Sequence, residues 1–173
     1  MKRIAMFAVL AFGLSFIIMS CKDDNDNNTV PNDFDKTFMT NATYANRSEI
    51  DFGQLAFTKS QNDSIKAYAQ KMVADHTMAQ SELDSLGNKF SFTLPTTMDS
   101  AHQAMRPQLE ALSGYSFDTA YINGQVRDHE ATITLFQNEA NQGFNPDVRN
   151  YASGKLPHLQ EHLQSANNVK SSL

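Results

Sequence analysis

Imidazole and carboxylate side chains recur at similar heights in the long helical segments of this sequence. They are Glu49, His76, His129 and, in the last segment, His162 or its neighbour His158. Counted from the turns at 1.5 Å of helix per residue, the first three and His158 fall within roughly 5 Å of one level, and His162 lies about 6 Å further along. Imidazole and carboxylate suit zinc, iron, copper or nickel, so the set predicts a transition-metal site in the core of a bundle.

The same residues also allow an interpretation without metal. Polar side chains in a helical seam can fix the register of the helices by hydrogen-bonding one another. Both a metal site and a metal-free polar core therefore remain open. Asp75 and Asp128 directly precede His76 and His129. Because neighbouring residues of a helix point about 100° apart, we expect these aspartates to support the histidines from outside or to face solvent.

A shorter motif points to a different chemistry. His158-Leu159-Gln160-Glu161-His162 matches the H-x-x-E-H pattern of inverted zinc peptidases. Those enzymes need a third ligand well downstream, whereas this sequence continues for 173 − 162 = 11 residues after the motif. The motif would also face the core of its own bundle. We therefore expect no peptidase, and no catalytic residue is assigned.

Apolar residues recur with helical spacing in nearly every segment after residue 33. Helices are predicted over about residues 35–59, 63–88, 99–112, 116–142 and 146–170. In the first, the seam positions 38, 42, 45, 49, 52 and 56 have the heptad spacing of bundle packing. Two hairpins joined by a long crossover with a short helix predict an all-α, ferritin-like four-helix bundle over residues 34–173.

The first twenty residues have the pattern of an export signal. Lys2 and Arg3 precede an apolar run over residues 4–19, which is shorter than the roughly 20 residues that span a bilayer. Ile18-Met19-Ser20-Cys21 resembles a lipobox, and Cys21 is the only cysteine, so no internal disulfide is expected. The sequence predicts a signal peptide over residues 1–20 and a lipid on Cys21 that anchors the protein to a membrane.

Residues 21–33 are acidic and asparagine-rich, which predicts a disordered tether with a reach of about 20 Å. Without residues 1–20, 14 − 2 = 12 Lys and Arg face 19 Asp and Glu, a net charge near −7. This argues against nucleic acid or anionic lipid as a partner, so membrane contact is expected through the lipid alone. We expect the protein at the outer membrane, facing the periplasm or the cell surface. The sequence names no protein partner.

Several short motifs together resemble family 4142 of the domains of unknown function. They are Ala45-Asn46-Arg47-Ser48-Glu49-Ile50, Met72-Val73-Ala74-Asp75-His76, Phe117-Asp118-Thr119-Ala120-Tyr121, Asp128-His129-Glu130, Leu156-Pro157 and His162-Leu163. The resemblance covers about residues 38–169. It implies an exported, ferritin-like protein without a proven activity, whose characteristic polar positions are Glu49, His76, His129 and His162. The resemblance thus favours His162 over His158.

One departure from ferritins proper bears on activity. Their di-iron sites use Glu-x-x-His on two helices, and only Asp99-Ser100-Ala101-His102 comes near that pattern here. Iron storage and ferroxidase activity are therefore not expected. Two classes of function remain, a metal-binding or metal-sensing bundle of the envelope that holds zinc, iron or copper, and a metal-free surface lipoprotein whose histidines only organise the core.

Overall fold

A computed structural model of the chain describes residues 30–173, and every regular element in that range is a helix. The helices are α1 (Asp33–Lys59), α2 (Asp63–Lys89), α3 (Ser100–Ala111), α4 (Gly114–Gln142) and α5 (Pro146–Ser171). The predicted all-α class is confirmed, and each predicted helix end lies within two residues of the observed one. The predicted signal peptide, Cys21 and most of the predicted tether lie outside the described residues. None of the helices in residues 30–173 is both long and apolar enough to cross a membrane.

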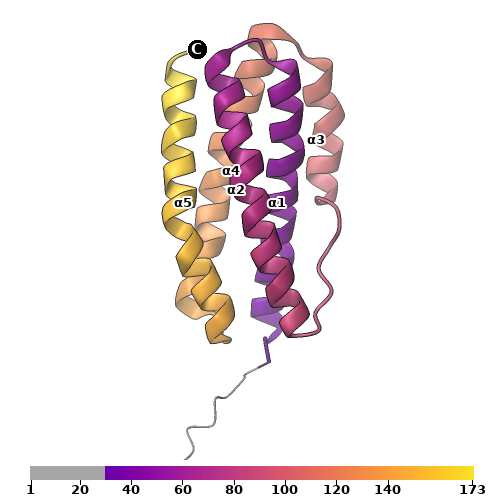
Figure 1. Cartoon of the computed structure of the whole chain (residues 1–173), viewed down its shortest axis with the longest axis vertical. Coiled ribbons are helices and arrows are strands. Elements are labelled where there is room, and N and C mark those ends of the chain that lie inside the picture. Colours follow the sequence, from indigo (N-terminus) through magenta and orange to yellow (C-terminus); the bar gives the residue numbers. More distant parts are fainter. Residues whose placement is uncertain (1–29) are drawn as a thin grey trace, which may run out of the picture.

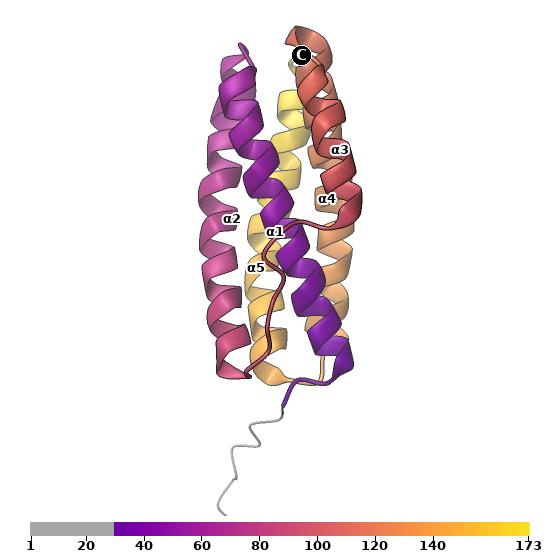
Figure 2. The same cartoon turned by 90° about the vertical axis from the view of Figure 1, so that its right-hand side faces the viewer.

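The four long helices form two hairpins that pack side by side (Figures 1 and 2). α1 pairs with α2 and α4 pairs with α5, while α1 also contacts α4 and α2 contacts α5. The crossover from α2 to α4 returns along the bundle and carries α3, which packs on the outside against α1 and α4. α4 therefore runs in the same direction as α2, and the end of α5 lies far from the start of α1 (Figure 1).

Asparagine and aspartate side chains begin four of the five helices. Asn32, Asn62, Asp99 and Asn145 each accept hydrogen bonds from backbone N–H groups of the first turn, which otherwise lack partners within the helix. α4 is the exception. The Ser116 capping signal predicted a start near residue 116, but the helix begins at Gly114, whose φ of +55° lies in the left-handed region that glycine adopts readily.

The core has two apolar clusters with a polar layer between them. One contains residues near the α1–α2 turn, including Phe52, Met72 and Phe117, and the other contains Phe38 and Phe136 near the opposite end. In each long helix a buried Glu or His side chain lies between the segments that supply the two clusters. These residues are Glu49, His76, His129 and His162, and all four are buried. The apolar clusters thus hold a polar layer at mid-bundle.

Candidate metal centre

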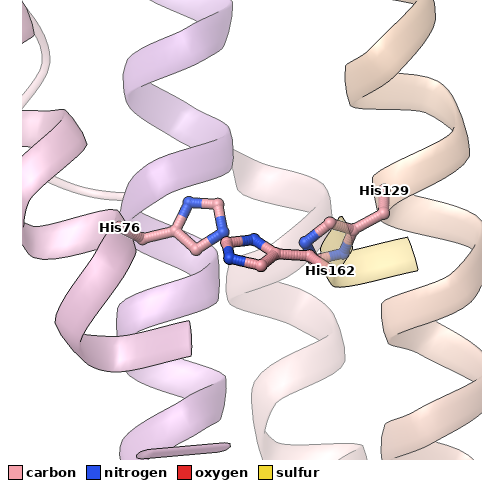
Figure 3. Close-up of side chains that lie close together, drawn as sticks. All are labelled: His76, His129 and His162. Carbon is pink, nitrogen blue, oxygen red and sulfur yellow. The ribbon is translucent and has the colours of Figure 1, made fainter. Parts of the chain in front are cut away.

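Three histidines from three helices meet in this layer (Figure 3). His76 comes from α2, His129 from α4 and His162 from α5. One ring nitrogen of each lies within 4.8 Å of those of the other two. The exposed fractions of the three residues are 4%, 1% and 2%, so solvent hardly reaches the group. Imidazole nitrogens are common ligands of zinc, so the three histidines are a candidate group to surround a single metal ion.

The tautomer of His76 is fixed by a chain of hydrogen bonds that ends on a carboxylate. Asp84 accepts from the Gln80 side-chain amide at 2.7 Å, so the Gln80 oxygen is left to accept from the Asn46 amide nitrogen at 3.3 Å. The Asn46 oxygen then faces His76 Nδ1 at 3.0 Å and can only accept. His76 Nδ1 must therefore carry the proton, and His76 Nε2 keeps its lone pair.

The other two rings are fixed by acceptors that cannot donate. His129 Nδ1 donates to the backbone carbonyl of Gln125 at 2.9 Å. His162 Nε2 donates to Asp75 Oδ2 at 2.8 Å, and the same oxygen accepts from Lys71 Nζ at 2.8 Å. Burial raises the pKa of Asp75, but the hydrogen bonds from Lys71 and His162 and the charge of Lys71 outweigh it and hold that pKa below its usual value. This carboxylate therefore accepts and does not donate. The lone pairs of His129 Nε2 and His162 Nδ1 are left free.

The three remaining nitrogens, His76 Nε2, His129 Nε2 and His162 Nδ1, are buried without a hydrogen-bond partner. Burial lowers the pKa of all three imidazoles, that of His162 to about 4, because the interior disfavours the charged form. At neutral pH the site therefore presents three neutral imidazoles with free lone pairs. This is the protonation state that binds metal.

Glu49 approaches the group but is not one of its members. Its Oε1 lies 3.6 Å from His129 Nδ1, which is the nitrogen already bonded to Gln125, and its Oε2 has no partner. Burial is the largest cause of a pKa of about 8 for this carboxyl group. Glu49 is therefore protonated at neutral pH and places an uncharged carboxyl group beside His129.

The remaining candidates occupy three different places. Asp75 accepts a hydrogen bond from His162 and orients its ring, as carboxylates beside metal-binding histidines do. Asp128 faces away from the group toward α3, with its Oδ2 3.9 Å from His102 Nε2. His158 is exposed, one turn before His162. Sequence reasoning overlooked Asn46 and Gln125. Their helical spacing was the available signal, because Gln125 lies four residues before His129 and Asn46 lies three before Glu49.

Comparison with known proteins agrees with this helical architecture. A fragment of a DUF305 protein from Deinococcus radiodurans, solved as a crystal structure, superimposes with a TM-score of 0.74 at 10% sequence identity. The match covers 83% of this chain and 99% of the fragment, and at that identity it is evidence for the fold alone. No curated protein matches the chain. The family model of the domain of unknown function DUF4142 matches residues 22–169, and the chain therefore belongs to the DUF4142 family.

Proposed function

We propose that this domain binds one divalent transition-metal ion through His76 Nε2, His129 Nε2 and His162 Nδ1. The observation that carries the proposal is the convergence of three buried lone pairs, each left free by a hydrogen bond on the other ring nitrogen. A buried polar atom without a partner costs about 1–3 kcal/mol, and a metal ion would satisfy all three at once. Zinc, copper and iron are the candidates, because neutral imidazole suits each of them.

The second contacts of the rings support a metal rather than a purely structural role. Metal-bound histidines usually donate their other N–H to a carboxylate or carbonyl oxygen, and all three rings here do so. Three imidazoles leave a fourth coordination position open in a tetrahedral geometry. No enzymatic activity is proposed.

The proposal extends to the setting of the domain. A signal peptide and a lipid on Cys21 would place the bundle at the outer membrane of the envelope, as the lipobox resemblance suggests. A ferritin-like relationship is supported by the order of the helices, with α2 and α4 running in the same direction on either side of a long crossover. We expect no nucleic acid and no anionic lipid surface as partner.

Metal titration of protein prepared without metal tests the proposed site. Zinc, copper and iron are each added in a thermal unfolding experiment, and at about 100 times the Kd the bound ion should add about 2.7 kcal/mol of stability, a rise of Tm on the order of 10 °C. His76→Ala, His129→Ala and His162→Ala should lose this response. Asn46→Ala keeps the three rings but removes the acceptor of His76, together with the donor to Gln80, and should weaken binding about 10–100-fold.

His158→Ala is the matched control, since it removes an exposed histidine from the same helix as His162. It should bind metal as the wild type does. If no metal raises the wild-type Tm, or if the three core variants respond as the wild type does, the histidines form a metal-free polar core and the alternative of a structural surface lipoprotein stands.

A further inference from the structure

A side pocket between α2 and α5 leads to the histidines. Its volume is about 180 Å³, and its wall includes two of the three rings, His76 and His162. Since roughly 10–15 Å³ of such volume is enough for one water molecule, it has room for a partly hydrated ion. Exposed residues of the same wall carry sulfur, imidazole and carboxylate groups on Met78, His158 and Glu82.

Four other pockets in the part of the chain that the structure describes do not reach the three histidines. The two apolar clusters fill the bundle on either side of the polar layer. A larger pocket of about 330 Å³ lies between α3 and α4, but none of the three histidines lines it. The same is true of the three remaining pockets described in residues 30–173. The α2–α5 pocket alone among these reaches the rings.

One ion pair connects the two helices at this pocket. Lys155 Nζ of α5 lies 2.6 Å from Glu82 Oε1 of α2, and both residues line the pocket. The Lys155 ammonium group also lies over the ring of Tyr151, another lining residue, at 5.7 Å from its centroid. The Glu82 side chain is 56% exposed, so solvent screens the pair and it can open readily.

We infer that the α2–α5 pocket is the route by which the metal ion enters and leaves, and that the Lys155–Glu82 pair closes its mouth. The inference rests on the proposed metal site and adds the way in which that site exchanges its ion. Small oxygen-donor ligands such as water or a carboxylate would reach the open fourth coordination position by the same route. Met78, His158 and Glu82 offer donor groups to an ion at the mouth, outside the site proper.

Zinc exchange in the full chain tests the route. Ala79 lines the pocket, so Ala79→Phe should obstruct it, and both association and dissociation of zinc should slow at least tenfold while Kd stays within about threefold. Ala74→Phe, at an exposed position of the same helix outside the pocket, is the matched control and should exchange at the wild-type rate. Dissociation is followed by trapping released zinc with an excess of a coloured chelator, and Ala79→Leu replaces the phenylalanine variant if circular dichroism shows that the latter is unfolded.

In the test of the Lys155–Glu82 ion pair, zinc dissociation is expected to become faster instead of slower. Lys155→Gln should speed zinc dissociation severalfold, whereas Lys170→Gln, exposed at the end of the same helix, should not change it. Zinc exchange at the wild-type rate in the folded Ala79 variants overturns the route, and an unchanged rate in Lys155→Gln overturns the closing role of the pair. In both cases the metal site itself survives, whereas failure of the wild type to bind zinc removes the site and the route together.

Discussion

Two buried carboxyl groups in this bundle are held protonated at neutral pH. Glu49 lies beside His129, and Glu139 lies at the far end of α4 with no exposed surface. Burial is the main cause that raises the pKa of each to about 8, and at Glu139 the neighbouring Asp35 adds to it. Asp35 is buried too, and its oxygens accept from the backbone N–H groups of Asn32, Phe144 and Asn145. Ionisation of Glu139 would place a second charge beside this carboxylate.

The pH dependence of stability should reveal these two groups. Their folded-state pKa lies above the ordinary value of 4.5, so the stability they contribute is complete below pH 4.5 and is lost as the pH rises through about 8. In metal-free protein the free energy of unfolding should therefore fall between about pH 7 and 8, by up to about 1.4 kcal/mol per pH unit for each group, and should level off above about pH 8. The histidines contribute little above about pH 7, because burial lowers their pKa in the folded state and the unfolded imidazoles, with an ordinary pKa of 6.5, are then mostly neutral too.

Urea unfolding across this pH range measures the effect. Glu139→Gln keeps the shape of the protonated side chain and should remove about half of the slope, while Glu49→Gln with Glu139→Gln should remove nearly all of it. Glu130→Gln, at an exposed position of the same helix, is the control and should keep the wild-type slope. An equally steep loss of stability in the double variant would show that other groups cause it.

The sequence named all three histidines of the candidate site, but His162 was favoured over His158 by the family resemblance and not by helical heights. Helical heights placed Glu49, His76, His129 and His158 together, whereas the structure groups His162 with His76 and His129 and leaves His158 exposed. Counting from turns measures height along a helix only. Which side chain faces the centre depends on the rotation of α5 against its neighbours, and that rotation is set by packing in three dimensions.

At the scale of the helices, a comparison of two glycines shows how closely α1 and α2 pack at one of them. A Cβ on Gly53 of α1 would lie 2.8 Å from Val73 Cγ2 and 3.1 Å from the carbonyl oxygen of Ala69, both on α2. A Cβ on Gly154 of α5 would meet nothing within 4 Å. The first glycine is therefore needed for close approach of the helices, and the second only weakens a helix.

Alanine substitution should have opposite signs at these two positions. Gly154→Ala should stabilise the protein by about 0.5–1 kcal/mol, because alanine loses less backbone entropy in a helix. Gly53→Ala gains the same term but must push α1 away from Val73 and Ala69, with a typical cost of about 1–3 kcal/mol, so the net effect should be destabilising. Chemical denaturation of both variants gives the two free energies directly, and a stabilised Gly53→Ala protein would contradict the close packing of α1 and α2.

The extents of the helices followed from sequence because their signals are local. Asn62, Asp99 and Asn145 with Pro146 act through hydrogen bonds within three residues, and heptad spacing repeats along each helix. The start of α4 was less predictable. Ser116 is a suitable capping residue, but the backbone turn at Gly114 moves the start two residues earlier. The position of α3 against α1 and α4 also depends on long-range contacts that periodicity does not contain.

At the scale of the whole molecule, the folded domain begins close to the proposed lipid. α1 starts at Asp33, 33 − 21 = 12 residues after Cys21. Asp35 joins this end of α1 to the α4–α5 turn, so the chain leaves the bundle at a well-fixed end. The tether predicted from the sequence would reach about 20 Å, which would keep this end of the bundle near the membrane.

The proposed anchor makes a prediction that separates membrane attachment from folding. Cys21→Ala removes the thiol that would carry the lipid, so the exported protein should move from the membrane fraction to the soluble fraction. Its helical circular dichroism and its metal response should stay unchanged, because the buried residues of both core clusters and the three histidines all come from residues 38–166.

Mass spectrometry of the wild type should show a diacylglyceryl group on an N-terminal cysteine. Asn27→Ser changes a residue of the predicted tether, outside the lipobox, and controls for altered export. A Cys21→Ala protein that stays in the membrane fraction would contradict the lipid anchor. The acidic surface of the domain offers no electrostatic attraction to anionic lipid that could hold it there instead.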